Sequence, residues 1–337
     1  MDQKPQAVMV PMDVPWEGRW LSWVAATTAC LRALGVECDA ADVAGMSGYA
    51  FILNVHQTVD VSSPTAFDWA WLTAGVQLMG RSTMELHPFD MGEKADPTGD
   101  LRLAGCQAAY DLAAREVGEG RPCVLWGAYL PEFAVVIGVE DGFYHVKSFK
   151  QDMGQPQPPI KWDEVTNPSG SYVLAFPTET KATQLRRDAY AVGHAVQLLL
   201  GRGTMGEYAL GLSGYDAWIA ALEANKAQPY GNSYSTQCFA EGRDFACEFL
   251  GRISKRTPEA AEPLGRAVAA YDEASTAMHA LRDVFRHPPK DEVNDPAKRA
   301  RGVELLKAAK LAETRASGAL LEALRFWTGK LLDREGE

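Results

Sequence analysis

The chain lacks most of the short motifs by which an enzyme class is recognised from sequence. It contains no HExxH pair, no Walker A loop, no GxSxG elbow and no calcium-binding loop. Its six cysteines form no CxxC pair, and no histidine stands at metal-ligand spacing. These absences argue against zincin, P-loop and α/β-hydrolase chemistry, and we expect no metal and no cofactor.

Positive charge is also scarce. Lys and Arg number 33 against 44 Asp and Glu, for a formal net charge of -11. Such a chain offers no broad cationic face to nucleic acid or to anionic lipid, so neither is an expected partner. No apolar run is long enough to span a bilayer, and the first residues show no signal-peptide pattern. We expect a cytoplasmic protein that binds a small molecule or a peptide.

The cysteines are scattered along the chain, which favours free thiols over a disulfide framework. A nucleophilic role for one of them is the alternative. They stand at Cys30, Cys38, Cys106, Cys123, Cys238 and Cys247.

The first half reads as a helix followed by an antiparallel sheet, the order typical of an α+β fold. Apolar and small residues at helical spacing predict a buried helix from Ser22 to Leu34, with Gly35 as its C-terminal cap. Asp141-Gly142 is a strong hairpin signal between two strands. The predicted strands are Gly75–Arg81, Cys123–Tyr129, Phe133–Glu140, Phe143–Phe149 and Ser171–Phe176.

Beyond Pro177 strand signals vanish and helix formers dominate, so we predict two domains, 1–178 and 179–337. Thr257 before Pro258 and Asp295 before Pro296 each predict an N-cap followed by proline at the first helical position. The second domain is predicted to be an all-α bundle. Its helices are expected at Thr183–Leu200, Tyr215–Asn225, Thr236–Ser254, Pro258–Phe285 and Pro296–Leu332.

Three stretches resemble the papain-like cysteine peptidases, in particular the bacteriocin-processing-peptidase-like proteins and the N-terminal domain of the butirosin biosynthesis protein H family. They are SWVAATTACLRALG at 22–35, GYAF at 48–51 and PEFAVVIGVEDGFYHV at 131–146. The resemblance covers roughly residues 10–178 and implies a papain-like domain ahead of the helical bundle. It also implies chemistry on an amide or thioester, as hydrolysis or as acyl transfer to an amine.

The residues that carry this chemistry in the family are replaced here. Counting back from Gly35, the nucleophile position falls on Ser22. The histidine position falls on Phe133, next to Glu132, and the position of the group that orients the histidine falls near Ser148. Cys30 lies about two turns into the helix, away from the positive end of its dipole, and is a poor substitute.

Two interpretations of Ser22 stay open. In one, Ser22 is a nucleophile with Glu132 as its base, and His145 is the histidine best placed to face a cleft. In the other, Ser22 is the N-cap of its helix and Glu132 pairs with a cation such as Arg19.

Several aromatic and polar residues are candidates for a ligand cleft, although core packing is the alternative for the aromatic ones. A wall formed by the second domain is part of this hypothesis. The candidate substrate-binding residues are Trp16, Trp20, Phe51, Trp69, Tyr230, Asn232, Glu241 and Arg243.

Three functional classes follow. The first is an amide or thioester hydrolase or acyltransferase with a degenerate catalytic site. The second is a pseudoenzyme that binds a small molecule or peptide in the same cleft. The third is a scaffold that forms a homo-oligomer through the long C-terminal helices.

Overall fold

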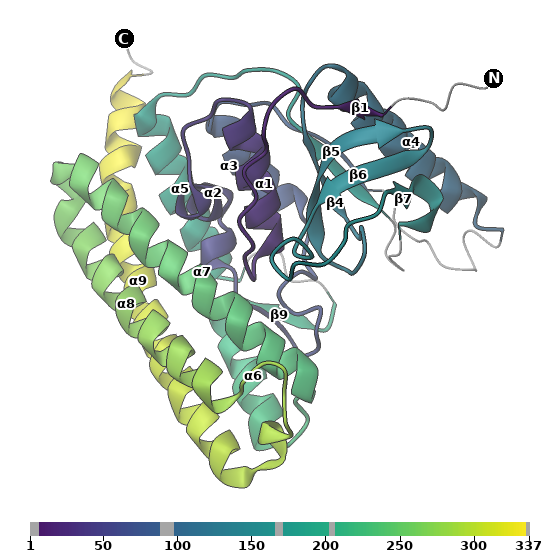
Figure 1. The fold of residues 1–337 in the computed structure, drawn as a ribbon. Helices are drawn as coiled ribbons and strands as arrows, with labels where there is room; N and C mark the ends of the chain where they lie inside the picture. Colours follow the sequence, from purple (N-terminus) through teal and green to yellow (C-terminus); the bar gives the residue numbers. More distant parts are fainter. Residues whose placement is uncertain (1–6, 88–97, 166–170, 202–205, 335–337) are drawn as a thin grey trace, which may run out of the picture. The chain divides into compact units, whose positions relative to one another are not determined.

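The structure, a computed structural model, describes residues 7–87, 98–165, 171–201 and 206–334, with side chains up to residue 328 (Figure 1). The chain divides into two compact units. The first comprises Met1–Val43 and Val76–Lys181, and the second comprises Ala44–Gly75 and Ala182–Glu337. The predicted domain boundary at 178 lies close to residue 181, after which the chain stays in the second unit. Residues 44–75 nevertheless belong with the helical unit, so the prediction of a continuous second domain needs this correction.

The first unit contains an antiparallel sheet in the order β3-β8-β4-β5-β6-β7. The short strand β1 also pairs with β5. Strands β4 and β5 lie in the middle of this order. The hairpin of β5 and β6 turns at Asp141-Gly142 as predicted, and both residues have positive φ. The strands are β1 (Val8–Met9), β3 (Met84–Leu86), β4 (Cys123–Trp126), β5 (Phe133–Glu140), β6 (Phe143–Lys147), β7 (Ile160–Lys161) and β8 (Tyr172–Ala175).

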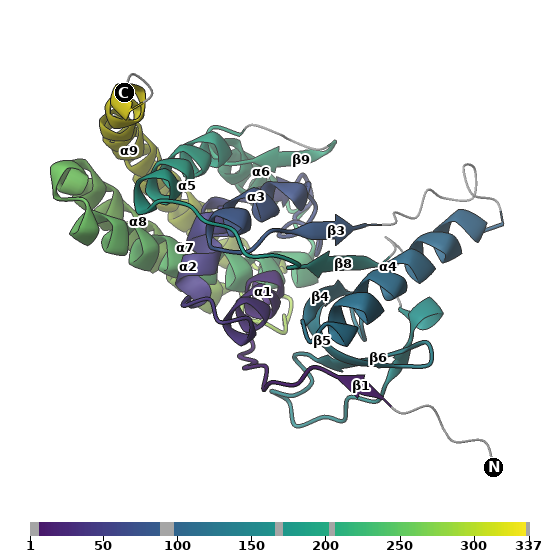
Figure 2. The same cartoon turned by 90° about the horizontal axis from the view of Figure 1, so that it is seen from above.

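Helices α1 (Ser22–Ala33) and α4 (Asp100–Gly118) pack on this sheet. Figure 2 shows α4 running across β4, β5 and β8. All residues of α1 from Ser22 to Leu31 are buried, because its small Ala and Thr side chains allow close packing on β4 and β5. The helix ends as predicted, with Gly35 at φ +81°.

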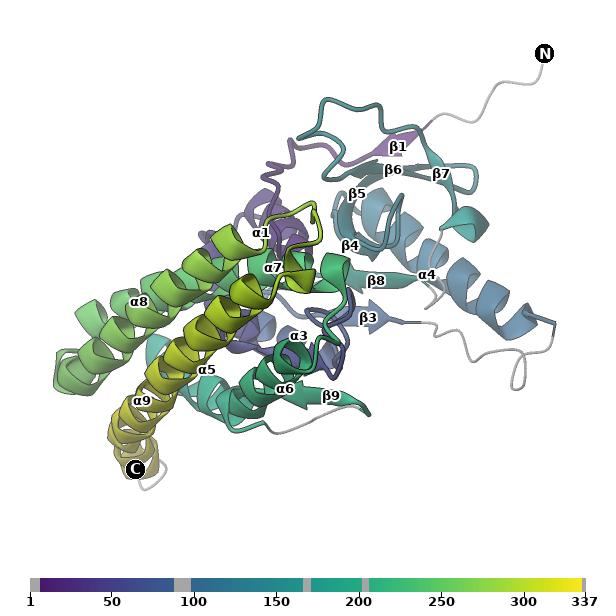
Figure 3. The same cartoon turned by 90° about the horizontal axis from the view of Figure 1, so that it is seen from below.

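The second unit is built around long helices, of which α8 and α9 lie side by side (Figure 3). A two-stranded antiparallel sheet pairs β2 (Asn54–His56) with β9 (Tyr208–Leu210). The helices are α5 (Gln184–Leu199), α6 (Leu212–Glu223), α7 (Pro229–Arg256), α8 (Ala261–Val284) and α9 (Pro296–Arg334). A mixed fold of helices and antiparallel sheet is confirmed.

The second unit's helix starts bear out one predicted cap and contradict the other. Asp295 Oδ1 accepts the N–H of Ala297 at 2.8 Å and of Lys298 at 3.3 Å, which caps α9. Thr257 makes no side-chain cap bond. Short 3₁₀ turns complete the structure at Tyr49–Phe51, Trp162–Glu164, Pro258–Ala260 and Glu292–Asn294.

The strand predicted at Gly75–Arg81 is wrong. Helix α3 (Ala70–Leu78) occupies most of it, and α2 (Ala40–Ser47) precedes it in the chain. Leu72, Val76 and Met79 recur at helical spacing and are all buried. The helix begins at Ala70, five residues before Gly75. The predicted strand started at Gly75 and so included only part of the helical pattern of apolar residues. The division between the two units falls within α2 and within α3.

Candidate active site

The start of α1 brings Ser22 and Glu132 together. Ser22 is the first residue of the helix, and its hydroxyl donates a hydrogen bond to the Glu132 carboxylate, which precedes β5. The same oxygen accepts the backbone N–H of Phe133 at 3.2 Å. Ser22 is only 8% exposed. Ser22 and Glu132 are therefore joined by a hydrogen bond, as the predicted pair requires, while a catalytic role for them stays a prediction.

The alternative role of Ser22 as an N-cap is wrong. Leu21 occupies the N-cap position, and its side chain makes no cap hydrogen bond. Arg19 Nη2 lies 3.0 Å from the Glu17 carboxylate. The Ser22 hydroxyl thus bonds to the loop before β5 and not to its own helix.

His145 does not reach this pair. It lies on β6 opposite Gly138, which is five residues along β5 from Phe133 and thus roughly 17 Å away at the usual rise of a strand. Its Nε2 lies 3.1 Å from the carboxylate of Glu140. The structure therefore does not bring His145 to the Ser22–Glu132 pair. Ser148 donates to Gln157 Oε1 at 2.8 Å and has a local structural role.

Three loops meet around the start of α1 through contacts that the sequence does not reveal. The Trp16 indole N–H donates to Asp152 Oδ2 at 3.0 Å, and a side chain at Gly18 would overlap Asp152. Tyr129 O–H donates to the Pro158 carbonyl at 2.7 Å, and Lys150 Nζ lies 4.1 Å from the centre of the Tyr129 ring. Together with the Ser22–Glu132 bond, these contacts join residues 16–22, 129–133 and 148–158.

Each of these loops exposes one large apolar side chain. Trp20 is 41% exposed, Leu130 51% and Met153 63%. Each stands at most two residues from a residue that makes one of the bonds just described. Trp20 is one of the predicted substrate-binding residues, whereas Leu130, Met153 and Asp152 are not, because loops carry no periodic pattern that shows where they meet.

Trp16, which precedes α1, and Cys30, which lies within α1, are both buried. Trp16 is 9% exposed, and its indole N–H is bonded to Asp152. Its side chain therefore holds the loop of Asp152 in place and offers little surface to a ligand. Cys30 is fully buried, and this burial raises the pKa of its thiol well above the usual value. All six cysteines are free, as expected, and Cys30 is not a substitute nucleophile.

Four of the predicted substrate-binding residues belong to the core of the second unit. Phe51 packs edge-on against Tyr271, and the Trp69 indole donates to the Thr65 carbonyl at 2.7 Å. Asn232 Oδ1 accepts the Trp218 indole N–H at 2.8 Å, and Arg243 is ion-paired to Glu313. Phe51, Asn232 and Arg243 are 0% exposed and Trp69 is 7% exposed, so none of the four presents a surface to a ligand.

Tyr230 and Glu241 retain solvent-accessible surface in the second unit. Tyr230 is 53% exposed, and its ring lies 5.0 Å from that of His287. Glu241 is half-buried. A ligand-binding role for these two residues stays a prediction.

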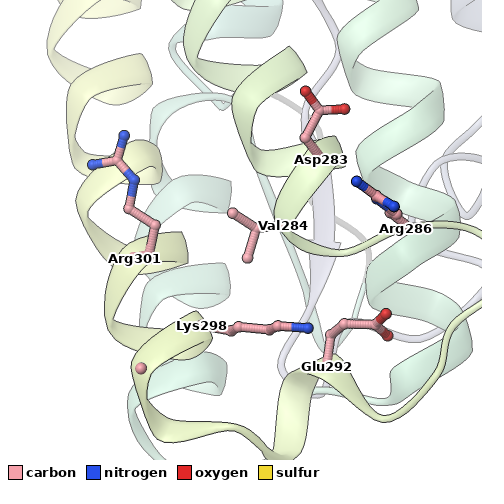
Figure 4. A pocket seen from close by; sticks show the side chains of 7 residues that line it. Asp283, Val284, Arg286, Glu292, Lys298 and Arg301 are labelled. Carbon is pink, nitrogen blue, oxygen red and sulfur yellow. The ribbon is translucent and has the colours of Figure 1, made fainter.

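The second unit also contains a pocket of 470 Å³ beside the end of α8 and the start of α9. Figure 4 shows charged side chains of both signs around Val284. Arg286, Lys298 and Arg301 supply positive charge, while Asp283 and Glu292 supply negative charge. This mixture favours no single ligand charge, and the pocket includes none of the predicted site residues.

The described residues include no group of three or more His, Cys, Asp or Glu side chains placed to hold a metal ion. Within the same ranges, no helix combines the length and apolar character that a bilayer-spanning segment needs. Comparison with family descriptions and with curated protein sequences finds no match.

Proposed function

We propose that this chain is an acyl-transfer enzyme, a hydrolase or acyltransferase acting on an amide or thioester, with Ser22 as nucleophile and Glu132 as general base. The hydrogen bond from the Ser22 hydroxyl to the Glu132 carboxylate carries this proposal. A nucleophile and a base within hydrogen-bond reach are the geometric requirement for serine activation.

The reaction follows from these two groups. Ser22 Oγ attacks the carbonyl carbon of the substrate while its proton passes to Glu132. The tetrahedral intermediate collapses, the bond to the thiol or amine breaks, and the leaving group takes the proton from Glu132. Water or an acceptor amine then attacks the Ser22 ester, and Glu132 accepts the attacker's proton before returning it to Ser22.

The position of Ser22 supports the same proposal. It begins a buried helix of 12 residues, whose N-terminal end carries partial positive charge. Negative charge that develops on the substrate carbonyl oxygen would be stabilised at this end. A nucleophile at the start of a helix packed on antiparallel strands is the papain-like layout, which we propose for the first unit.

A second candidate is a non-catalytic protein that binds its ligand at the same place. The observation in its favour is that the Ser22 hydroxyl both donates to Glu132 and accepts from Phe133, while Ser22 is 8% exposed. A substrate must displace the Phe133 N–H or share the hydroxyl with it. In this candidate the Ser22 bond fastens the loop before β5 to α1.

Turnover of model acyl thioesters distinguishes the two candidates. The enzyme predicts measurable hydrolysis by the wild type and a loss of at least about 100-fold in kcat/KM for both Ser22→Ala and Glu132→Gln. Glu140→Gln is the matched control, because Glu140 lies at the far end of β5 and bonds to His145. Its rate should equal that of the wild type.

No thioester or amide turnover by the wild type, or equal rates in wild type and Ser22→Ala, would exclude the enzyme. The binding candidate then predicts a ligand that raises Tm in proportion to the logarithm of its concentration.

A further inference from the structure

The first unit buries the charged side chain of Arg81 without a partner. Arg81 is 9% exposed, and its Nε is inaccessible to solvent and makes no hydrogen bond. Within the described side chains, Nη1 and Nη2 form no hydrogen bond or ion pair either. They are not inaccessible in the way that Nε is, so they still face solvent. Buried guanidinium groups are normally paired with an anion, because the loss of their hydration is otherwise uncompensated.

The backbone that carries Arg81 is fixed on both sides. Arg81 pairs with Glu179 in an antiparallel bridge between the segment before β3 and the segment after β8. Ser82 N–H donates to the Thr178 carbonyl at 2.8 Å on one side, and the Gly80 carbonyl accepts a bond at 3.0 Å on the other. Glu179 therefore lies directly across from Arg81, yet its side chain is exposed and makes no ion pair with the guanidinium.

Positive charge exceeds buried negative charge at this end of the sheet, where β3, β8 and β4 are neighbours (Figure 2). Arg121 lies just before β4, and Glu116 accepts hydrogen bonds from both Arg121 and Arg115. With Arg81, three guanidinium groups thus share one buried carboxylate. Glu119, which lies 4.0 Å from Arg121, is exposed. Two positive charges remain without a buried counterion.

The electrostatics of Arg81 agree with this count. Burial lowers the pKa of its guanidinium, and the nearby charge of Arg121 lowers that pKa further. The carboxylates of Glu179 and Glu116 act in the opposite direction but do not restore the usual value. The surroundings of Arg81 therefore disfavour its positive charge, and an anion bound at Nη1 and Nη2 would reverse this effect.

We propose that Arg81 binds a doubly charged phosphate group, carried by free phosphate or by a small phosphate monoester. The parallel N–H groups of a guanidinium match the oxygens of such a group, and its two charges balance the two positive charges left here. A carboxylate would balance only one of them.

This site is separate from the Ser22–Glu132 pair. Arg121 lies at the start of β4, whereas Trp126 at the end of β4 pairs with Phe133, to which Ser22 is bonded. The phosphate site therefore does not depend on the proposed acyl transfer, and either can fail without the other.

The test is thermal unfolding of the full chain at constant ionic strength, with chloride replaced stepwise by inorganic phosphate, phenyl phosphate or acetate. At about pH 8 the phosphate probes are mainly doubly charged. We expect Tm to rise with the logarithm of the concentration of at least one phosphate probe, and much less with acetate. A larger effect of phenyl phosphate identifies a monoester as the ligand, and a larger effect of inorganic phosphate identifies the free ion.

Arg81→Gln should weaken phosphate binding at least about tenfold, because it removes the charged N–H donors. Its matched control is Arg32→Gln, which removes the same charge from an exposed arginine of the same unit on α1. Glu179→Gln changes an exposed residue and removes a competing carboxylate, so it should tighten binding roughly two- to fivefold.

Three outcomes would overturn the proposal. They are a Tm that phosphate raises no more than acetate does, equal weakening by Arg81→Gln and Arg32→Gln, and unchanged or weaker phosphate binding in Glu179→Gln. The last variant keeps the test decisive even if Arg81→Gln fails to fold.

Discussion

At the scale of single residues, the Ser22 hydroxyl satisfies two groups of the loop before β5, the Glu132 carboxylate and the Phe133 N–H. Ser22→Ala leaves the buried N–H of Phe133 without this partner. We expect the free energy of unfolding to fall by about 1–2 kcal/mol, because the substitution removes both hydrogen bonds of the Ser22 hydroxyl. Urea denaturation measures this loss.

The control for Ser22→Ala is Ser82→Ala, because the Ser82 hydroxyl bonds to exposed groups of Thr178. This substitution should change stability by less than about 0.5 kcal/mol. Equal effects of the two substitutions would mean that the Ser22 bond does not hold the loop to α1.

Glu116 is a buried carboxylate whose charge depends on two arginines. Its Oε2 accepts from Arg121 Nε at 2.6 Å, and its Oε1 accepts from Arg115 Nη2 at 3.0 Å. Desolvation opposes ionisation, but these hydrogen bonds outweigh it and lower the pKa of Glu116. A carboxylate with a lowered pKa stabilises the folded state above its unfolded pKa, and this contribution is lost as pH falls through the folded pKa.

We therefore expect Glu116→Gln to be less stable than the wild type at pH 7, by about 1–3 kcal/mol. The difference should shrink as pH falls below about 4, where the unfolded glutamate becomes protonated first and the folded one, with its lowered pKa, follows at lower pH. Urea denaturation of both proteins between pH 7 and pH 3 measures it. A difference that is constant over this range would show that the arginine contacts do not depend on the glutamate charge.

At the scale of elements, much of the fold was predictable where a long pattern exists. The β5–β6 hairpin and the start of α9 follow from Asp141-Gly142 and from Asp295-Pro296. Strands β1 and β7 have two residues each, and an alternating pattern cannot be recognised in so short a segment. Ser22 and Glu132 were predicted from the family resemblance of the stretches that contain them, whereas the contact between Trp16 and Asp152 joins residues 136 apart through a loop.

Two of the helical glycines, Gly75 and Gly265, test how closely the elements of the second unit pack. A Cβ on Gly75 of α3 would overlap the Met46 carbonyl oxygen of α2. We expect Gly75→Ala to cost about 1–3 kcal/mol through overpacking. Gly265 of α8 has open space around its Cα, so Gly265→Ala should stabilise the chain by about 0.5–1 kcal/mol.

Thermal unfolding of the two glycine variants is the measurement. The same sign of change in Tm for both substitutions would contradict the close approach of α2 and α3.

At the scale of the whole molecule, local periodicity identified the helices of the second unit but not the segment that completes it. Residues 44–75 supply β2, which pairs with β9. They also supply the Ile52 carbonyl, which accepts Arg243 Nη1 at 2.7 Å inside the core. Pairing between distant segments has no signature in the pattern of one sequence. A homo-oligomer through the long helices stays a prediction.

A fragment of residues 179–337 should consequently fold poorly, because the buried Arg243 loses an acceptor and β9 loses its partner. We expect low cooperativity in thermal unfolding followed by circular dichroism. A chain in which residues 44–75 are joined to residues 182–337 by a flexible linker should unfold cooperatively. Equal melting behaviour of the two chains would show that residues 44–75 are dispensable to the helical unit.

The central claim is that Ser22 accepts an acyl group, and intact-mass spectrometry after incubation with an octanoyl thioester tests it most directly. We predict a mass increase of one octanoyl group, located on the peptide that contains Ser22 and absent from Ser22→Ala. Glu132→Gln should form the same adduct at least about 100-fold more slowly. An unmodified wild type, or an adduct that persists in Ser22→Ala, would contradict the claim and leave a binding protein as the better description.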